Sequence, residues 1–205
     1  MKSKETVETI VEKIGTTAVE RLEANLSKAE FKELPEEIVL VAFKEEQILE
    51  VYGITNDRIK FIKEYPFTAF SGKLGPKLKE GDQQIPEGIY HVEYLNPNSS
   101  YYLSIKVSYP NEFDREKSNL SSVAKMGGDI FIHGKAATVG CIPVGDEAIE
   151  EVFLLTQNAL HKSVKIIISP KDFRVNNVFP KIEAIDWEEE LYGIIEQELS
   201  TIPLK

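Results

Sequence analysis

The stretch Asp129-Ile-Phe-Ile-His133-Gly134-Lys-Ala-Ala-Thr138-Val-Gly140-Cys141-Ile-Pro143 carries the strongest signal in this chain of 205 residues. It contains the only cysteine, and one of the three histidines lies before it, at the end of an apolar run typical of a strand. A thiol nucleophile needs a base within hydrogen-bond reach and amide donors directed at the developing oxyanion. A strand ending in His-Gly, followed by a short loop to Gly-Cys, can supply both. Cys141 and His133 are therefore the candidate nucleophile and base, although a lone cysteine is more often a small buried apolar residue.

Around this stretch the chain resembles the L,D-transpeptidase catalytic domain (YkuD superfamily), in which His-Gly precedes a Ser/Thr-x-Gly-Cys loop, here Thr138-Val139-Gly140-Cys141. The resemblance is to the YafK-like murein transpeptidase and amidase branch, and it runs from about Ile38 to Arg174. Further segments that carry it are Ser71–Lys77, Glu80–Asp82, Pro86–Tyr90, Leu95–Ser100, Leu103-Ser104, Tyr109–Asn111 and Pro170–Arg174. The terminal segments show no comparable resemblance.

The resemblance implies a cysteine enzyme that attacks the diaminopimelate carbonyl of a peptidoglycan stem peptide and forms a thioester. An amine would resolve the thioester as L,D-transpeptidation, and water would resolve it as amidase or L,D-carboxypeptidase activity. The branch includes an amidase that releases lipoprotein from murein, so hydrolysis of the thioester is expected slightly ahead of crosslinking. The implied partners are stem peptides and a murein-linked lipoprotein, the implied location is the periplasm or cell envelope, and no cofactor is expected.

Roles within the motif follow from thiol chemistry. His133 would take the proton of Cys141, and a backbone carbonyl, that of Gly134, is a better candidate than a carboxylate for orienting the imidazole. The amides of Gly140 and Cys141 would stabilise the oxyanion. Thr138 is a candidate substrate contact, with a structural role in the loop equally open.

Substrate carboxylates need a cation from outside the motif, because Pro143 stands where an arginine often follows the cysteine in the superfamily. Arg174 is the first candidate, since its planar fork pairs well with carboxylates. A structural contact with Asp172 is the alternative. Lys77 is a second candidate, and Tyr109 is the candidate aromatic substrate contact, although most strand tyrosines are packing residues.

The hydrophobic pattern predicts an α+β fold: a mixed or antiparallel β-sandwich-like sheet with flanking N- and C-terminal helices. We expect domain limits of 1–34 for an N-terminal helical segment, 35–175 for the catalytic domain and 176–205 for a C-terminal helical extension. Helices are expected over 6–28, broken at Gly15, over 147–160 with Asp146 as the N-cap, and over 185–199. Residues 111–122 are expected to hold a short helix or flap. Strands are expected over 38–43, 47–52, 59–62, 67–70, 89–95, 101–107, 129–133 and 164–168.

Composition narrows the class of protein. The chain is 42% hydrophobic and 28% charged, which is ordinary for a globular domain. Its net charge of -10 argues against a surface that binds nucleic acid. One cysteine cannot form an internal disulfide, and no His or Cys spacing indicates a metal site. No run is long enough for a transmembrane segment, and the N-terminus lacks the apolar core of a signal peptide.

Because the resembled family acts outside the cytoplasmic membrane, we expect a processed form whose leader was removed. A cytoplasmic or secreted protein is the alternative. Two other functions stay open at this point. One is a catalytically inactive peptidoglycan-binding protein, and the other is a thiol amidase or toxin acting on another isopeptide.

Overall fold

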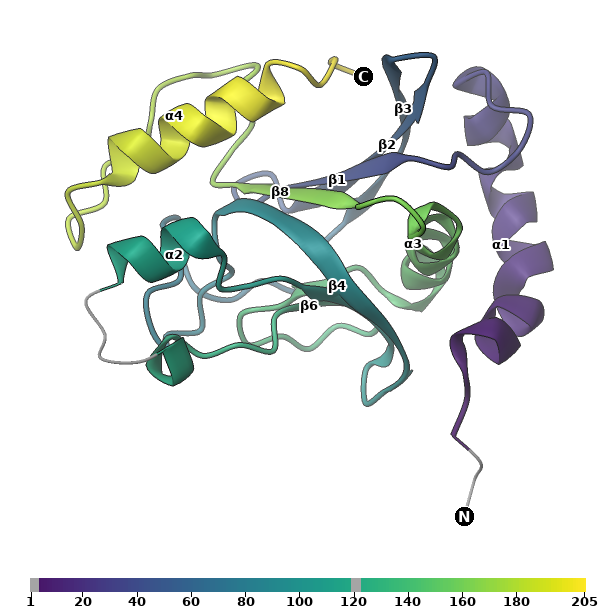
Figure 1. Cartoon of the computed structure of the whole chain (residues 1–205), viewed down its shortest axis with the longest axis horizontal. Coiled ribbons are helices and arrows are strands. Elements are labelled where there is room, and N and C mark those ends of the chain that lie inside the picture. Colours follow the sequence, from purple (N-terminus) through teal and green to yellow (C-terminus); the bar gives the residue numbers. More distant parts are fainter. Residues whose placement is uncertain (1–3, 119–122) are drawn as a thin grey trace.

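A mixed sheet of eight strands forms the centre of the protein, in the order β3-β2-β1-β8-β4-β5-β6-β7 (Figure 1). The structure, a computed structural model, describes residues 4–118 and 123–205. The strands are β1 (Ile38–Phe43), β2 (Ile48–Thr55), β3 (Arg58–Pro66), β4 (Gly88–Ser99), β5 (Tyr102–Val107), β6 (Phe131–His133), β7 (Ile142–Pro143) and β8 (Lys165–Ser169). The helices are α1 (Val7–Lys28), α2 (Glu112–Lys117), η1 (Val123–Met126), α3 (Asp146–Ala159) and α4 (Glu188–Leu199).

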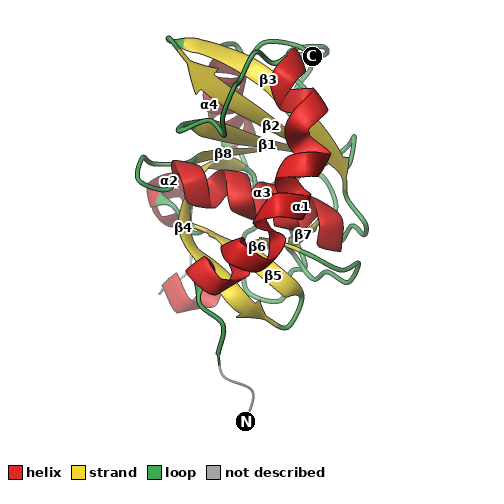
Figure 2. Cartoon of the chain, turned by 90° about the vertical axis from the view of Figure 1, so that its right-hand side faces the viewer, coloured by secondary structure: helices red, strands yellow, loops and turns green. Residues whose placement is uncertain are grey.

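The half of the sheet formed by β1 and β8 is covered on both faces. Leu40 and Ala42 of β1 pack into the core beneath α1 and α3, whereas Val41 and Phe43 pack into a second core beneath α4. This double burial explains why the strand is a continuous apolar run rather than an alternating one. Figure 1 shows α4 along one side of β8, and Figure 2 shows α1 and α3 side by side on the other.

Strand β4 joins two parts of the sheet. Its first residues, Gly88 to His91, pair antiparallel with β8, and the remainder pairs antiparallel with β5. Register shifts along the β4–β5 pair bend the strand away from β8, as its curved ribbon shows (Figure 1). The pairs β1–β8 and β6–β7 are parallel. The predicted α+β fold with a mixed, sandwich-like sheet and flanking helices is therefore confirmed.

Several local predictions need correction. Helix α1 continues through Gly15, since Ile14 and Ala18 are buried on its core face and nothing crowds the glycine. Residues 67–70 form no strand, and α3 has Gly145 rather than Asp146 as its N-cap. Asp146 is the first helical residue, and its carboxylate accepts from the N–H of Lys135 at 2.8 Å. The short helix expected within 111–122 is α2, and residues 119–122 lie outside the described part.

A buried ion pair anchors the long loop between β3 and β4. The side chains of Lys44 and Glu87 are 0% exposed, and Nζ lies 2.9 Å from Oε1. Lys44 also donates to the carbonyls of Gly75 and Ile85 at 2.7 and 2.8 Å. Glu87 accepts from the Gly75 N–H at 2.7 Å and from the hydroxyl of Tyr192 in α4 at 2.8 Å. Sheet, loop and α4 are thus joined by one fully buried polar network.

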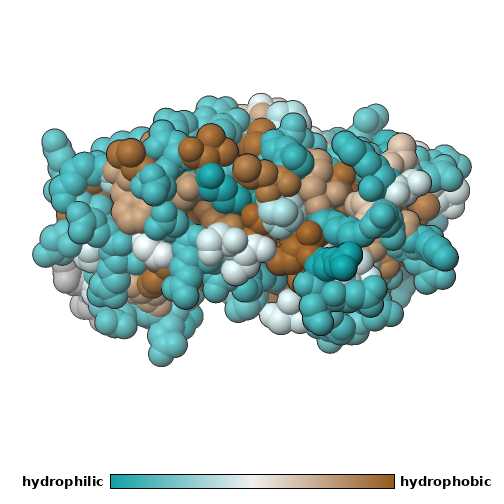
Figure 3. All heavy atoms as spheres, turned by 90° about the horizontal axis from the view of Figure 1, so that it is seen from above, coloured by the Kyte–Doolittle hydropathy of each residue, from teal (hydrophilic) through white to brown (hydrophobic). Residues whose placement is uncertain are grey.

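The surface on the α4 side is mainly hydrophilic, interrupted by small hydrophobic patches (Figure 3). Large apolar side chains exposed in the C-terminal part of the chain are Val175, Val178, Ile194 and Leu204. None of the described helices is both apolar enough and long enough to cross a membrane.

Candidate active site

Alternation along β5, β6 and β7 gives this part of the sheet a core face and a polar face. Leu103, Ile105 and Val107 of β5 are in the core, as are Ile132 and Ile142. Successive strand residues point to opposite faces, so the residues between these point away from the core. The opposite face therefore carries Ser104 and Lys106 from β5, Phe131 and His133 from β6, and Cys141 just before β7.

The strand register brings the cysteine and the histidine to one place. In the antiparallel β5–β6 pair, Ser104 lies opposite His133. In the parallel β6–β7 pair, Ile132 lies opposite Ile142, which puts Cys141 alongside Phe131. Cys141 and His133 both line a cavity of about 410 Å³. Its other lining residues are Asn96, Ser99, Ser100, Tyr101, Ser104, Asp129, Phe131, Ala137, Thr138 and Val139.

His133 is held in one tautomer and one orientation. Its Nδ1 lies 2.6 Å from the carbonyl oxygen of Gly134, and because a carbonyl only accepts, Nδ1 carries the proton. Nε2 is left with a lone pair. The ring of Tyr101 packs against the imidazole with 4.6 Å between centroids. Burial lowers the pKa of His133, opposed by the Gly134 carbonyl, so the ring is a neutral base at neutral pH.

Gly134 must be a glycine for this arrangement. A Cβ at this position would lie 2.6 Å from Asp146 Oδ1 and 2.9 Å from the Tyr101 carbonyl oxygen. Without a side chain at this position, the strand can approach α3 and the β4–β5 turn closely. The backbone carbonyl of Gly134 is then in place to orient the imidazole.

The thiol of Cys141 is protonated at rest. Its Sγ lies 3.4 Å from the carbonyl oxygen of Asp129. Burial raises the pKa of Cys141, while the Phe131 backbone and the Lys106 ammonium act in the opposite direction. A raised pKa for the thiol and a lowered one for the imidazole both favour a neutral thiol–imidazole pair over a thiolate–imidazolium pair.

This protonation state predicts how Cys141 reacts with iodoacetamide. The thiolate is the reactive form, and a raised pKa makes it scarce at neutral pH. We expect the alkylation rate to rise through a midpoint above that of a free thiol, whose pKa is about 8.5. The rate of alkylation is measured between pH 6 and 10 by mass spectrometry of samples quenched at set times, with N-acetylcysteine as the reference thiol, and its pH dependence gives this midpoint. A midpoint below the reference would show a resting thiolate instead.

The two amides expected to bind an oxyanion are both occupied. The N–H of Gly140 donates to Ser71 Oγ at 2.7 Å, and that of Cys141 donates to Thr138 Oγ1 at 2.9 Å. Each N–H thus has an intramolecular acceptor, and its role toward an oxyanion stays a prediction. Gly140 has a φ of +86°, and a Cβ there would lie 2.9 Å from the Gln84 carbonyl oxygen, so the loop needs glycine.

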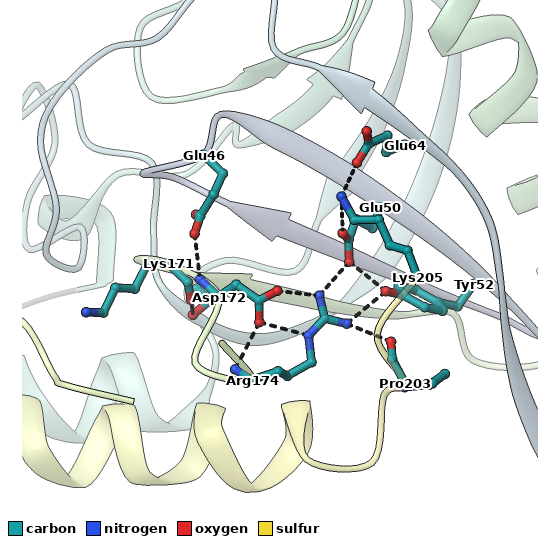
Figure 4. Close-up of polar contacts among 10 residues, drawn as sticks. Glu46, Glu50, Tyr52, Glu64, Lys171, Asp172, Arg174, Pro203 and Lys205 are labelled. Carbon is teal, nitrogen blue, oxygen red and sulfur yellow. Dashed lines mark hydrogen bonds and ion pairs between the residues drawn. The ribbon is translucent and has the colours of Figure 1, made fainter. Parts of the chain in front are cut away.

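The structure contradicts the expectation that Arg174 binds substrate carboxylates (Figure 4). Its guanidinium binds Asp172 through Nε and Nη2 at 2.8 and 2.7 Å, and Nη2 also lies 2.8 Å from Glu50 Oε2. Nη1 donates to the Tyr52 hydroxyl and the Pro203 carbonyl. Arg174 is absent from the lining of the cavity and packs against β2, toward the opposite edge of the sheet. The structural alternative, a contact with Asp172, is the observed one.

Lys77 and Tyr109 are also absent from the lining of the cavity. The Lys77 ammonium is bound to Asp82 at 2.6 Å and to the Lys79 carbonyl at 2.9 Å. Tyr109 is 4% exposed, and its hydroxyl donates to the Lys77 carbonyl. Both expected substrate contacts are thus structural. Thr138 does line the cavity, but its hydroxyl donates to the Cys141 carbonyl at 2.7 Å and shapes the loop.

Sequence reasoning missed several polar residues at or beside the cavity: Asn96, Ser104 and Asp129 line it, Ser71 accepts from Gly140, and Lys106 pairs with Asp129. A signal for two of them was present. In the strand over 103–107, Ser104 and Lys106 alternate with apolar residues and so mark a second, polar face. The strand that ends at His133 lies beside it, so this polar face is the one next to the histidine. Ser71 offered no such signal, because its partner Gly140 is distant in sequence.

Comparison with known proteins gives the family. A family model described as "YkuD: L,D-transpeptidase catalytic domain" matches residues 37–168. The protein named "Putative L,D-transpeptidase YafK" of Escherichia coli strain K12 is 33% identical over 138 residues, which are 65% of this chain and 54% of that protein. The protein of the same name from Escherichia coli O157:H7 matches equally. The chain spans about half the length of these curated relatives.

Solved structures show the same fold. The helical cell shape determining protein Pgp2 from Campylobacter jejuni superimposes with a TM-score of 0.53 at 18% identity, covering 88% of this chain and 77% of that one. A variant of Pgp2 gives a TM-score of 0.54 at 22% identity, covering 89% and 62%.

Proposed function

This chain belongs to the L,D-transpeptidase catalytic domain family, and from this premise we propose that it is a cysteine-dependent enzyme acting on peptidoglycan stem peptides. One observation supports the proposal most: Cys141 and a base-competent tautomer of His133 line the same cavity. An inactive peptidoglycan-binding protein would not need this pair. The substrate class follows from the family, and the bond attacked is the one after the diaminopimelate carbonyl.

The first half-reaction forms a thioester. His133 Nε2 takes the thiol proton as Sγ bonds to the carbonyl carbon, which becomes tetrahedral with a negatively charged oxygen. The imidazolium then gives this proton to the leaving nitrogen, the C–N bond breaks, and the carbonyl re-forms as a thioester with Cys141. Charge on the oxygen would be stabilised when the Cys141 N–H is shared between Thr138 Oγ1 and the substrate.

The second half-reaction decides the product. Water or an amine attacks the thioester, His133 accepts the proton of the attacking group, and the thiolate leaves and is reprotonated. Amine attack gives L,D-transpeptidation, and water gives an amidase or L,D-carboxypeptidase. We propose hydrolysis ahead of crosslinking, with a murein-linked lipoprotein as a further partner and the periplasm or cell envelope as the location.

Defined muropeptides test the proposal. The protein is incubated with disaccharide tetrapeptides and with a stem peptide joined to a lipoprotein-derived lysine, and products are identified by mass. Loss of the terminal D-residue, release of the lysine, or formation of dimers would identify carboxypeptidase, amidase or transpeptidase activity respectively. Rapid quenching should capture an acyl adduct on the peptide that contains Cys141. No product and no adduct from any of these substrates would refute the proposal and favour a binding role or a different isopeptide substrate.

A further inference from the structure

Lys106 is a buried cation on the polar face that carries Cys141 and His133. Its side chain is 8% exposed, and in the β5–β6 register it lies opposite Phe131. Within the described residues, the ammonium has two contacts: it lies 5.0 Å from the centroid of the Phe131 ring and 3.5 Å from Asp129 Oδ1. The Asp129 side chain is 93% exposed, so this ion pair is both long and solvated on its acidic side.

A second lysine of this chain shows what a fully satisfied buried ammonium looks like. Lys44 Nζ has three oxygen partners at 2.7, 2.8 and 2.9 Å, one for each N–H. Lys106 has one partner, at a longer distance. Burying an ammonium is costly unless it is paired and hydrogen-bonded. Lys106 therefore retains donor capacity that a ligand anion can use.

Lys106 is not itself one of the residues that line the cavity of Cys141, but its ammonium lies next to two residues that do. Asp129 and Phe131, the two residues that it contacts, both line that cavity. Its register neighbour on β6 stands alongside Cys141, and its positive charge lowers the pKa of Cys141 against the effect of burial. A negatively charged group that enters the cavity beside the sulfur can reach Lys106 once the exposed Asp129 side chain turns into solvent.

We propose that Lys106 binds a free carboxylate of the acyl donor, taking the place there that Arg174 was expected to fill. The substrate carboxylate replaces that of Asp129 and forms a shorter, desolvated ion pair, and so holds the donor with its carbonyl against Cys141. This inference rests on the proposed function for the identity of the donor. Two stem-peptide groups have the required chemistry: the terminal carboxylate of the leaving residue and the side-chain carboxylate of the diamino acid.

The test compares tetrapeptides amidated at one or the other carboxylate with the free acid. We expect wild-type kcat/KM to fall about 10- to 100-fold for one of the two amides, the range for a hydrogen bond to a charged group. Lys106→Met should lose a similar factor on the free acid and no longer discriminate between acid and amide. Lys106→Arg should keep most of the discrimination. Lys165→Met, a lysine-to-methionine change on β8, is the matched control and should behave as wild type.

Binding measurements keep the two proposals separate. The same peptides are titrated against Cys141→Ala and Cys141→Ala/Lys106→Met by calorimetry. Wild-type protein that turns over none of the peptides would refute the proposed function, while a Kd that depends on the carboxylate only when Lys106 is present would still support its role. Equal effects of Lys106→Met on acid and amide, in kcat/KM or Kd, would overturn the inference. So would absence of binding of any peptide.

Discussion

Replacing Cys141 with alanine should lower turnover of stem peptides by about 10⁴- to 10⁶-fold, the loss seen when a covalent nucleophile is removed. Alanine cannot accept the acyl group, whereas His133 keeps its bond to Gly134 and its contact with Tyr101. The Sγ–Asp129 carbonyl hydrogen bond is long, 3.4 Å, so we expect its loss to change the free energy of unfolding by less than about 1 kcal/mol. Product formation is followed by chromatography with mass detection, and folding by circular dichroism.

Two further variants make this result specific. His133→Gln should also lose turnover, yet its thiol should still react with iodoacetamide at alkaline pH, which separates loss of the base from loss of the nucleophile. Val175→Ala, at a side chain 74% exposed in the C-terminal part of the chain, should match wild type. If Cys141→Ala retained more than about a tenth of wild-type turnover, the thioester route would have to be abandoned, because truncating a covalent nucleophile leaves far less than this.

The sequence contained enough information to predict that Cys141 and His133 lie at one place in the fold, where both line the same cavity, and the physical reason is local. Both sit where period-two alternation and a short loop fix the direction of the side chain, and neighbouring strands then bring them together. The apolar run over 38–43 likewise predicted a strand, and the structure adds that this strand is buried on both faces. The resemblance to the L,D-transpeptidase family added the fold, which the structure confirms.

Arg174 shows where such reasoning stops. An arginine next to a strand end reads equally well as a ligand for substrate and as a structural cation, and the deciding partners, Glu50 and Tyr52, lie on β2, far away in sequence (Figure 4). Lys106 is the converse case. A lysine in a strand suggests a solvent-facing position, yet pairing with β6 buries it.

At Gly15, packing against the core outweighs the low helix propensity of glycine. A glycine inside a helix costs about 1 kcal/mol relative to alanine, which favoured a break. The buried residues Ile14, Ala18 and Leu22 hold both halves of α1 against the same core, and this burial exceeds the local cost. The hydrogen bond between Ser71 and Gly140 could not be predicted, because it exists only once the loop before β4 has folded over the nucleophile loop.

Replacing Lys44 with methionine should lower the free energy of unfolding by about 3 to 5 kcal/mol, as expected when one partner of a buried ion pair is removed. Methionine fills similar space, but it leaves the Glu87 carboxylate, 0% exposed, without a counter-charge. The carbonyls of Gly75 and Ile85 lose their donor as well. Urea unfolding, followed by circular dichroism and by the fluorescence of Trp187, gives the value.

The double variant Lys44→Met/Glu87→Gln decides whether the uncompensated charge is the cause. Its neutral amide needs no counter-charge, so the double variant should be more stable than Lys44→Met alone, and the coupling between the two sites should exceed about 1 kcal/mol. Lys162→Met is the surface control: Lys162 pairs with Glu37 where both side chains are partly exposed, and its loss should cost less than about 1 kcal/mol. A Lys44→Met variant no less stable than this control would show that the network does not anchor the loop.

Because that loop carries Ser71 and Gln84 against Gly140, a destabilised anchor should also make Cys141 more accessible to iodoacetamide below the urea midpoint.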